Sequence, residues 1–245
     1  MPRVIKHPDS RRKELLDLAF DLFLKRGNED ASLNDLIAAS GLSKGAFYHY
    51  FPSKQALLES LADRIAAQRL PELQKAFASN TSDPLDHLNR SLARSAALKI
   101  QNAEITGQLF GSGFFFRPEN HALFERITAA WEAAFLPLLT QAITDGVAKG
   151  RFSTKDAGGV AGMIQHLMSG TRSLVAQGVA AETDGDRRKA ASRLEKQFEL
   201  HGVAASRMLG LPDESVAIVP RGFATKFLAG FLTRPNKADA AARRA

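Results

Sequence analysis

The chain has 245 residues, no cysteine and a formal net charge of +7. This length suffices for a large buried core, and the lack of cysteine excludes disulfides and thiolate metal sites. A hydrophobic share of 44% excludes a disordered or fibrous protein. The longest uncharged run, residues 157–171, is shorter than the ~18 apolar residues of a membrane span, and the N-terminus lacks the apolar segment of a secretory signal. We therefore expect a folded cytoplasmic protein that does not associate with membranes.

The spacing of apolar residues predicts helices along nearly the whole chain. Apolar positions recur every three or four residues, and strand-like alternation is scarce, so the expected fold class is all-α. The first helix is expected over residues 10–26, with Gly27 placed to end it. After a fourth helix that begins at Ser53, further helical segments are expected at residues 84–103, 104–113, 119–149, 155–179, 187–210 and 221–232. The short turns between them indicate one second domain.

Between the first and fourth helices, two short helices are expected at residues 33–39 and 44–50. Ser32 and Asp35 have the spacing of a capping box, which begins the first of the two. A glycine-containing turn, residues 40–43, separates it from the second. Two short helices joined by such a turn are the layout of a helix-turn-helix.

The second of these short helices has one apolar side and one polar side. At 100° per residue, Phe47 and Phe51 point in one direction, whereas small and polar residues occupy the rest of the circumference. Tyr48 and Tyr50 are the only tyrosines, although 16 phenylalanines are present to fill a core. Their hydroxyls suit phosphate contacts, and the alternative is a packed ring with an exposed tip.

Cations lie in the first turn of three expected helices, at residues 11–13, at Lys44 and at Lys54. A helix N-terminus carries positive partial charge, so an exposed cation there costs ~0.3–1 kcal/mol. A DNA phosphate that binds both the free N–H groups and the cation reverses this cost. The alternative is that solvent screens the unfavourable charge.

The run GLSKGAFYHYF, followed by SK after one proline, closely resembles the DNA-binding segment of the tetracycline-repressor (TetR) family of transcriptional regulators. The resemblance extends over residues 32–58, and the rest of the chain matches only in its helical layout. It implies a sequence-specific DNA-binding regulator, a repressor released from its operator by a small, mostly apolar effector. The implied domains are residues 1–54 for DNA binding, 55–232 for ligand binding and dimerisation, and 233–245 as a flexible basic tail.

The resemblance also implies which residues contact a near-palindromic DNA operator. Base contacts are implied for Lys44, Gly45, Ala46 and Tyr48, and phosphate contacts for Ser32, Ser43, His49, Tyr50 and Lys54. Ala46 departs from the family pattern, in which a hydroxyl residue is common at this position, so one hydrogen bond to DNA is absent. The alternative for His49 is a solvated neutral imidazole at the helix end.

A homodimer held by the last two long helices is a further implication of the resemblance. The expected interface residues are Met163, Leu167, Leu194, Phe198 and Ala205. Their three- and four-residue spacing suits an intersubunit four-helix bundle, and it suits an intrachain core equally well.

Aromatic residues are concentrated between positions 109 and 152, where they form either a core or a ligand pocket. Gly111 and Gly113 break the helical pattern, and Pro137 is expected to kink a helix. Arg172 and Gln165 are polar candidates to orient a ligand or to lie at a surface. The expected pocket residues are Gln108, Phe110, Phe114, Trp131, Phe135 and His166.

Other classes of function have less support in the sequence. No nucleophile elbow, phosphate-binding loop or metalloprotease motif is present, so we expect no enzyme and no cofactor. The histidines show no metal-site spacing, so no metal site is expected. The alternative that stays open is a DNA-binding architectural or division-linked protein of the same fold that takes no small-molecule ligand.

Overall fold

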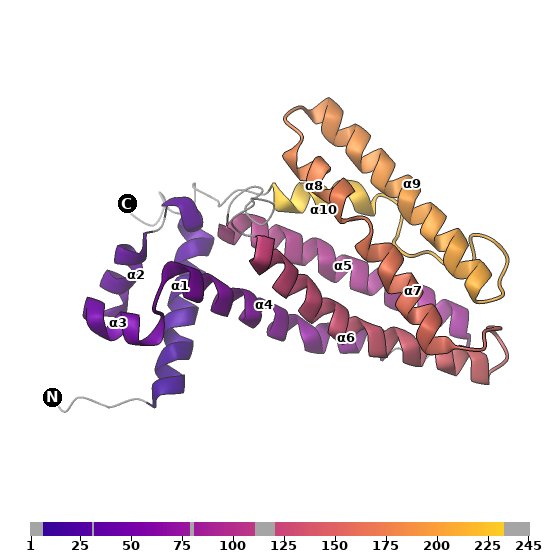
Figure 1. The fold of residues 1–245 in the computed structure, drawn as a ribbon, viewed down its shortest axis with the longest axis horizontal. Helices are drawn as coiled ribbons and strands as arrows, with labels where there is room; N and C mark the ends of the chain where they lie inside the picture. The colour runs from indigo at the N-terminus through magenta and orange to yellow at the C-terminus, as the bar shows by residue number, and fades with distance from the viewer. Residues whose placement is uncertain (1–6, 31, 79–80, 111–120, 233–245) are drawn as a thin grey trace.

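The computed structural model describes residues 7–30, 32–78, 81–110 and 121–232, and within these ranges it is helical with no strand. The predicted all-α class is therefore confirmed (Figure 1). The helices in chain order are α1 (Pro8–Asp30), α2 (Leu33–Ser40), α3 (Lys44–Tyr50), α4 (Lys54–Phe77), α5 (Pro84–Phe110), α6 (His121–Ala148), α7 (Ala157–Ser169), α8 (Arg172–Ala180), α9 (Asp184–Met208) and α10 (Phe223–Phe231). None of these described helices is long and apolar enough to cross a membrane.

Three differences from the predicted helices are the largest. The first helix continues through Gly27 to Asp30, because one internal glycine costs only ~1 kcal/mol and does not stop a helix. The segments predicted at 84–103 and 104–113 form the single helix α5. The segment predicted at 155–179 is divided at Gly170 into α7 and α8, since a turn there directs α8 towards α9 and α10.

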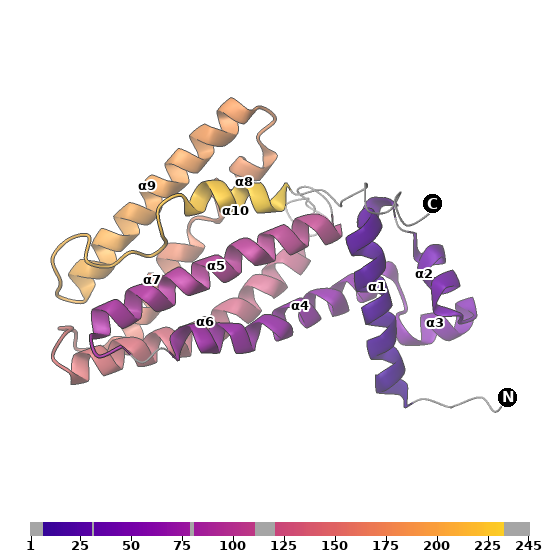
Figure 2. The ribbon, with the colours of Figure 1, turned by 180° about the vertical axis from the view of Figure 1, so that it is seen from behind.

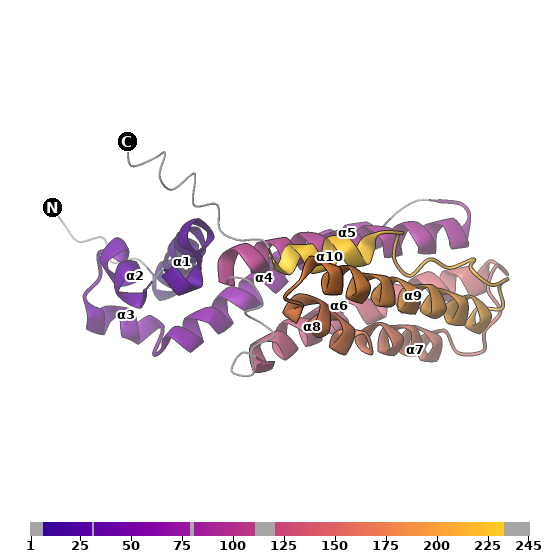
Figure 3. The same cartoon turned by 90° about the horizontal axis from the view of Figure 1, so that it is seen from above.

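The helices enclose two separate hydrophobic cores. The N-terminal core lies among α1 to α4 and the start of α6, and it includes the fully buried Phe23, Phe47 and Phe51. The second core lies among α4 to α10 and includes Leu139 and Leu194. Figure 3 shows the α1–α3 unit at one end of an elongated molecule and the α5–α10 bundle at the other.

Helix α4 belongs to both cores. Its first half places Leu57 and Leu61 in the N-terminal core, and its second half places Leu73 and Phe77 in the second core. Figure 2 shows α4 leading from one unit to the other, and α1 beside one end of α5. The N-terminal core thus extends into α4, past residue 54.

Two helices contain an internal proline and continue past it. Pro71 lies within α4 and Pro137 within α6, and each removes one backbone donor from its helix. Gly111 and Gly113, which were expected to break a helix, lie outside the described residues.

Candidate functional site

Local capping interactions build the α2–turn–α3 unit as predicted. The Asp35 N–H donates to Ser32 Oγ (3.1 Å) and the Ser32 N–H donates to Asp35 Oδ2 (2.9 Å), which completes the capping box. Gly41 ends α2 at φ +67°, a conformation that L side chains rarely adopt. Ser43 Oγ then accepts from the Ala46 N–H (3.3 Å) and begins α3.

The capping box also commits the hydroxyl of Ser32. Its Oγ donates to Asp35 Oδ2 at 2.7 Å in addition to accepting from the backbone. Both functions of this hydroxyl are therefore used within the protein, whereas the Ser43 hydroxyl keeps a free proton.

Helix α3 presents one face to the core and one to solvent. Phe47 is fully buried, and its ring meets Phe51 with centroids 5.8 Å apart. The solvent-facing side contains no acidic residue. Its predicted DNA-contact residues divide by exposure: Ser43, Lys44, Gly45, Tyr48 and His49 are exposed, Ala46 and Tyr50 are half-buried, and Ser32 and Lys54 flank the helix, exposed and half-buried respectively.

The arginines at the start of α1 have protein partners, which differs from the prediction that they await an anion. Arg11 donates to the Ser40 carbonyl at the end of α2 (2.9 Å), where the helix dipole favours a cation. Arg12 donates to Ser60 Oγ (2.6 Å), and its guanidinium lies 5.0 Å from the centre of the Phe51 ring. These two side chains hold α1 against α2 and α4.

A second site lies within the α5–α10 bundle, where the helices enclose a cavity of about 180 Å³. Its wall is mostly apolar. The apolar lining residues include Phe124, Ile127, Trp131, Phe135, Met168, Val175, Phe198, Phe223, Phe227 and Phe231, and the polar ones include Lys99, Asn102, Glu132, Gln165, Ser169 and Arg172. Such a wall with a few polar groups is typical of a small-molecule site.

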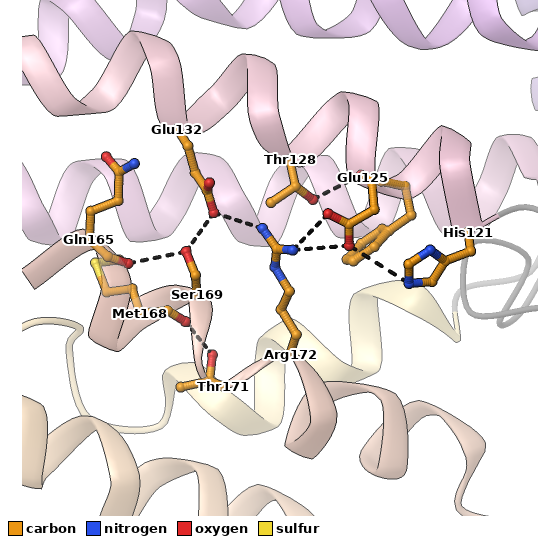
Figure 4. Close-up of polar contacts among 10 residues, drawn as sticks. His121, Glu125, Thr128, Glu132, Gln165, Met168, Ser169, Thr171 and Arg172 are labelled. Atoms are coloured by element: carbon orange, nitrogen blue, oxygen red, sulfur yellow. Dashed lines mark hydrogen bonds and ion pairs between the residues drawn. The ribbon is translucent and has the colours of Figure 1, made fainter. Parts of the chain in front are cut away.

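Three residues that line the cavity, Glu132, Ser169 and Arg172, belong to one hydrogen-bonded network (Figure 4). Arg172, at the start of α8, donates to both carboxylate oxygens of Glu125 (2.8 and 2.9 Å) and to Glu132 (2.9 Å). Ser169 also donates to Glu132 (2.5 Å). The network joins α7 and α8 to α6, and it satisfies the carboxylate that lines the cavity.

Several other polar groups on the cavity wall lack a hydrogen-bond partner. Among the described residues, Trp131 Nε1, Asn102 Oδ1 and Gln165 Oε1 are buried and unpartnered. The Lys99 ammonium lies 6.0 Å from the centre of the Trp131 ring and 5.9 Å from that of Phe135. Burial lowers the pKa of Lys99 to about 8, and the charge of Glu132 offsets part of this effect.

The cavity includes only some of the predicted pocket residues. Trp131 and Phe135 line it, as does Gln165. His166 is exposed on α7, and the prediction that it faces the pocket is wrong, because one step along a helix turns the side chain by 100° from Gln165. Phe114 lies outside the described residues, as do the side chains of Gln108 and Phe110.

Sequence reasoning missed Lys99 and the aromatic row of α10. Phe223, Phe227 and Phe231 recur every four residues, and neighbouring ring centroids lie 5.0 and 5.1 Å apart. This spacing is visible in the sequence. For Lys99 no sequence signal was available, because a lone lysine in an amphipathic helix is ordinarily solvated.

Three of the predicted dimer residues lie inside the protomer. Leu194 and Ala205 are fully buried, and Phe198 lines the cavity, so their assignment to a subunit interface is wrong. They share the face that α9 turns towards its own bundle. On α7, Leu167 is half-buried and Met163 is 50% exposed, and Leu200 on the outer side of α9 is 63% exposed.

No metal centre is apparent in the part of the chain that the structure describes. No three His, Cys, Asp or Glu side chains gather there in an arrangement that holds a metal ion.

The comparison with protein families finds a match in the N-terminal part of the chain. Residues 15–61 match the model of the family described as bacterial regulatory proteins, tetR family. The transcriptional repressor KstR2 of Mycobacterium tuberculosis is 33% identical over 106 residues, which cover 43% of this chain and 52% of that protein. The regulator EthR of the same organism is 40% identical over 75 residues, 31% of this chain and 34% of that protein. The chain thus spans about half the length of one of these relatives and a third of the other.

Solved structures share the fold over most of the chain. A transcriptional regulator from Cytophaga hutchinsonii has a TM-score of 0.56 at 18% identity, with 81% of this chain and 96% of that chain covered. A TetR-family transcriptional regulator from Pectobacterium atrosepticum has a TM-score of 0.55 at 20% identity, with 83% and 97% covered. The N-terminal helix-turn-helix of this chain is thus similar to that of the tetR family of bacterial regulatory proteins, and the chain shares its fold with regulators of known structure.

Proposed function

We propose that the chain is a cytoplasmic transcriptional repressor that binds a near-palindromic DNA operator and leaves it when a small, mostly apolar molecule enters the α5–α10 cavity. The observation that carries this proposal is the face of α3, where Lys44, Gly45 and Tyr48 are exposed opposite the buried Phe47. A helix with this division suits insertion into the major groove, since its apolar side is already fixed to a core.

The residues of this face have different roles in the proposal. Lys44, Gly45, Ala46 and Tyr48 read base edges, and the absence of a side chain at Gly45 permits a close approach. Phosphate contacts come from Ser43, His49, Tyr50 and Lys54. At Ser32 the backbone makes the phosphate contact, because the hydroxyl is already hydrogen-bonded to Asp35.

A homodimer places two copies of α3 on the two half-sites of the operator. We propose the outer faces of α7 and α9 as the interface, since these helices pack side by side and leave Met163 and Leu200 exposed. Gly162, one residue before Met163 on α7, has open space where a Cβ would stand, so another helix can approach closely there.

Two residues that line the cavity also pack against the N-terminal core. This contact provides a way for ligand binding to release the protein from DNA. Phe124 and Ile127 line the cavity and also pack against the N-terminal core. Close by on α6, Arg126 donates to both carboxylate oxygens of Asp63 on α4 (2.6 and 2.7 Å). A ligand that shifts α6 therefore acts directly on α4 and on the unit that contains α3.

The test is selection of bound duplexes from a random DNA library with the purified chain, with its mass in solution recorded alongside. A palindromic consensus bound by dimers is expected. Salt-sensitive binding without a consensus favours an architectural protein instead, and no binding refutes a DNA-binding function. The consensus duplex then serves in a release assay with candidate effectors.

A further inference from the structure

The cavity combines one cation that has no ion-pair partner with a carboxylate that is already satisfied. Lys99 forms no hydrogen bond or ion pair with another described residue. Glu132, the carboxylate of the described wall, accepts from Arg172 and Ser169. A cationic ligand therefore meets no free carboxylate and is repelled by Lys99, whereas an anionic ligand meets a free ammonium in a site of low polarity.

One buried donor on the same wall also lacks a partner. The Trp131 indole N–H is buried without an acceptor. An anion provides such an acceptor, and a buried donor left without one costs free energy. The unpartnered atom of Asn102, three residues after Lys99 on α5, is the acceptor Oδ1, which an anion does not satisfy.

The cavity volume limits the size of the ligand. Its volume is about 180 Å³, and an engineered apolar cavity of about 150 Å³ holds benzene. Typical pockets for drug-sized ligands have volumes of ~300–1,000 Å³. One substituted ring therefore fits, with the rings of Phe223 and Phe227 as its apolar surroundings.

We propose that the effector is a single-ring, benzoate-sized carboxylate whose anionic group pairs with Lys99 and whose ring lies among the aromatic side chains of α6 and α10. This assignment rests on the proposed function and names the chemical class of its effector. It makes Lys99 the residue that selects for anions and Trp131 a direct neighbour of the ligand.

Trp131 is the one tryptophan of the chain, so its fluorescence reports on the cavity without a label. The probes are 4-isopropylbenzoate, the neutral 4-isopropylbenzamide and the cationic 4-isopropylbenzylamine, titrated at pH 7 into the full chain. We expect the benzoate to quench or shift the emission and to bind at least tenfold tighter than either relative. The second readout is the increase in melting temperature that each probe causes, and this increase is expected to be largest for the benzoate.

The variants assign the selectivity to one side chain. Lys99→Met is expected to fold with a higher melting temperature, because a buried charge is removed, and to bind benzoate and benzamide equally. Lys99→Arg is expected to keep the preference for the carboxylate. Lys226→Met, which removes an exposed lysine from the outer side of α10, is the matched control and is expected to behave as the unmodified chain.

Three results overturn the inference: equal binding of the three probes, binding of none of them, or a carboxylate preference that survives in Lys99→Met. Anthracene-9-carboxylate tests the size limit, and tighter binding of this larger acid than of the benzoate overturns that part. These titrations contain no DNA. They can fail while operator selection succeeds, or succeed while it fails, so the two proposals are tested separately.

Discussion

The α1–α3 unit and the α5–α10 bundle differ in whether their buried polar groups have hydrogen-bond partners. In the α1–α3 unit, serine caps, a capping box and paired arginines satisfy the polar groups that fix the helix ends. In the described part of the chain, the buried side-chain atoms without a partner lie in α5 to α9, apart from Arg64 Nη1. Among the described residues, the α1–α3 unit has no buried side-chain nitrogen or oxygen without a partner, whereas four of the unpartnered residues of the second region, Asn102, Trp131, Gln165 and Arg172, line the cavity.

The largest expected effect is a loss of stability when the core of the α1–α3 unit is mutated. Phe47→Ala removes a fully buried ring that packs against Phe51 and is expected to destabilise the protein by ~3–5 kcal/mol. Urea unfolding followed by circular dichroism measures the change. Phe135→Ala, at the cavity, is the comparison and is expected to cost less because empty space already adjoins it. Equal losses in the two variants contradict the difference between the cores.

The second prediction separates specific from nonspecific contacts on the rigid surface. Lys44→Ala is expected to lower operator affinity by ~1–3 kcal/mol and to change sequence preference. Lys54→Ala is expected to weaken binding to all duplexes alike and to reduce the salt dependence. Fluorescence anisotropy on the selected operator and on a scrambled duplex, at several salt concentrations, distinguishes these outcomes. Identical profiles for both variants contradict the proposed division of roles.

The third prediction uses pH to examine the cavity. The pKa of Lys99 lies at about 8, so its ammonium loses its proton as the pH rises through that value. The other charged groups on the cavity wall are Glu132 on α6 and Arg172 on α8. Affinity for 4-isopropylbenzoate is therefore expected to fall about tenfold from pH 7 to pH 9.

The same titration with Lys99→Arg is the control for this pH dependence. An arginine stays protonated over the whole range, so its affinity for the benzoate is expected to stay flat. A fall of equal size in both proteins assigns the pH dependence to another group.

The smallest expected effect concerns the ion pair that joins α6 to α4. Asp63→Asn removes the exposed ion pair with Arg126 and is expected to leave stability nearly unchanged. It is expected to raise the ligand concentration needed to release the operator, because α6 is less firmly tied to α4. Release is measured by anisotropy across a benzoate titration. The exposed pair Arg207 and Asp213 is the control: Asp213→Asn is expected to leave release unchanged.

Much of the DNA-binding unit was predictable because its signals are local. The capping contacts of Ser32, Asp35 and Ser43 and the turn at Gly41 involve only residues a few positions away. Their spacing therefore predicts the helix ends that the structure contains. The buried pair Phe47 and Phe51 also follows from periodicity within one short helix. Even here, the partners of Arg11 and Arg12 were missed, since they lie on α2 and α4.

The cavity was predictable only in part. Trp131 and Phe135 were expected there, but Phe198 was assigned to a subunit interface and His166 to the pocket. A periodic stripe identifies the apolar face of a helix and does not identify what that face meets. Whether Leu194 meets its own chain or a second copy depends on how α9 packs against α8 and α10.

By itself, the sequence determined the all-α class, the helix-turn-helix and its likeness to the TetR family, because capping, turn residues and periodicity act over distances of a few residues. Only the tertiary structure decided that Lys99, Trp131, Gln165 and Arg172 share one cavity. Those residues come from four helices, and their meeting depends on packing between segments that are far apart in the chain. Among the described residues, that packing leaves the ammonium of Lys99 without a hydrogen bond or ion pair, which is the feature on which the proposed choice of ligand depends.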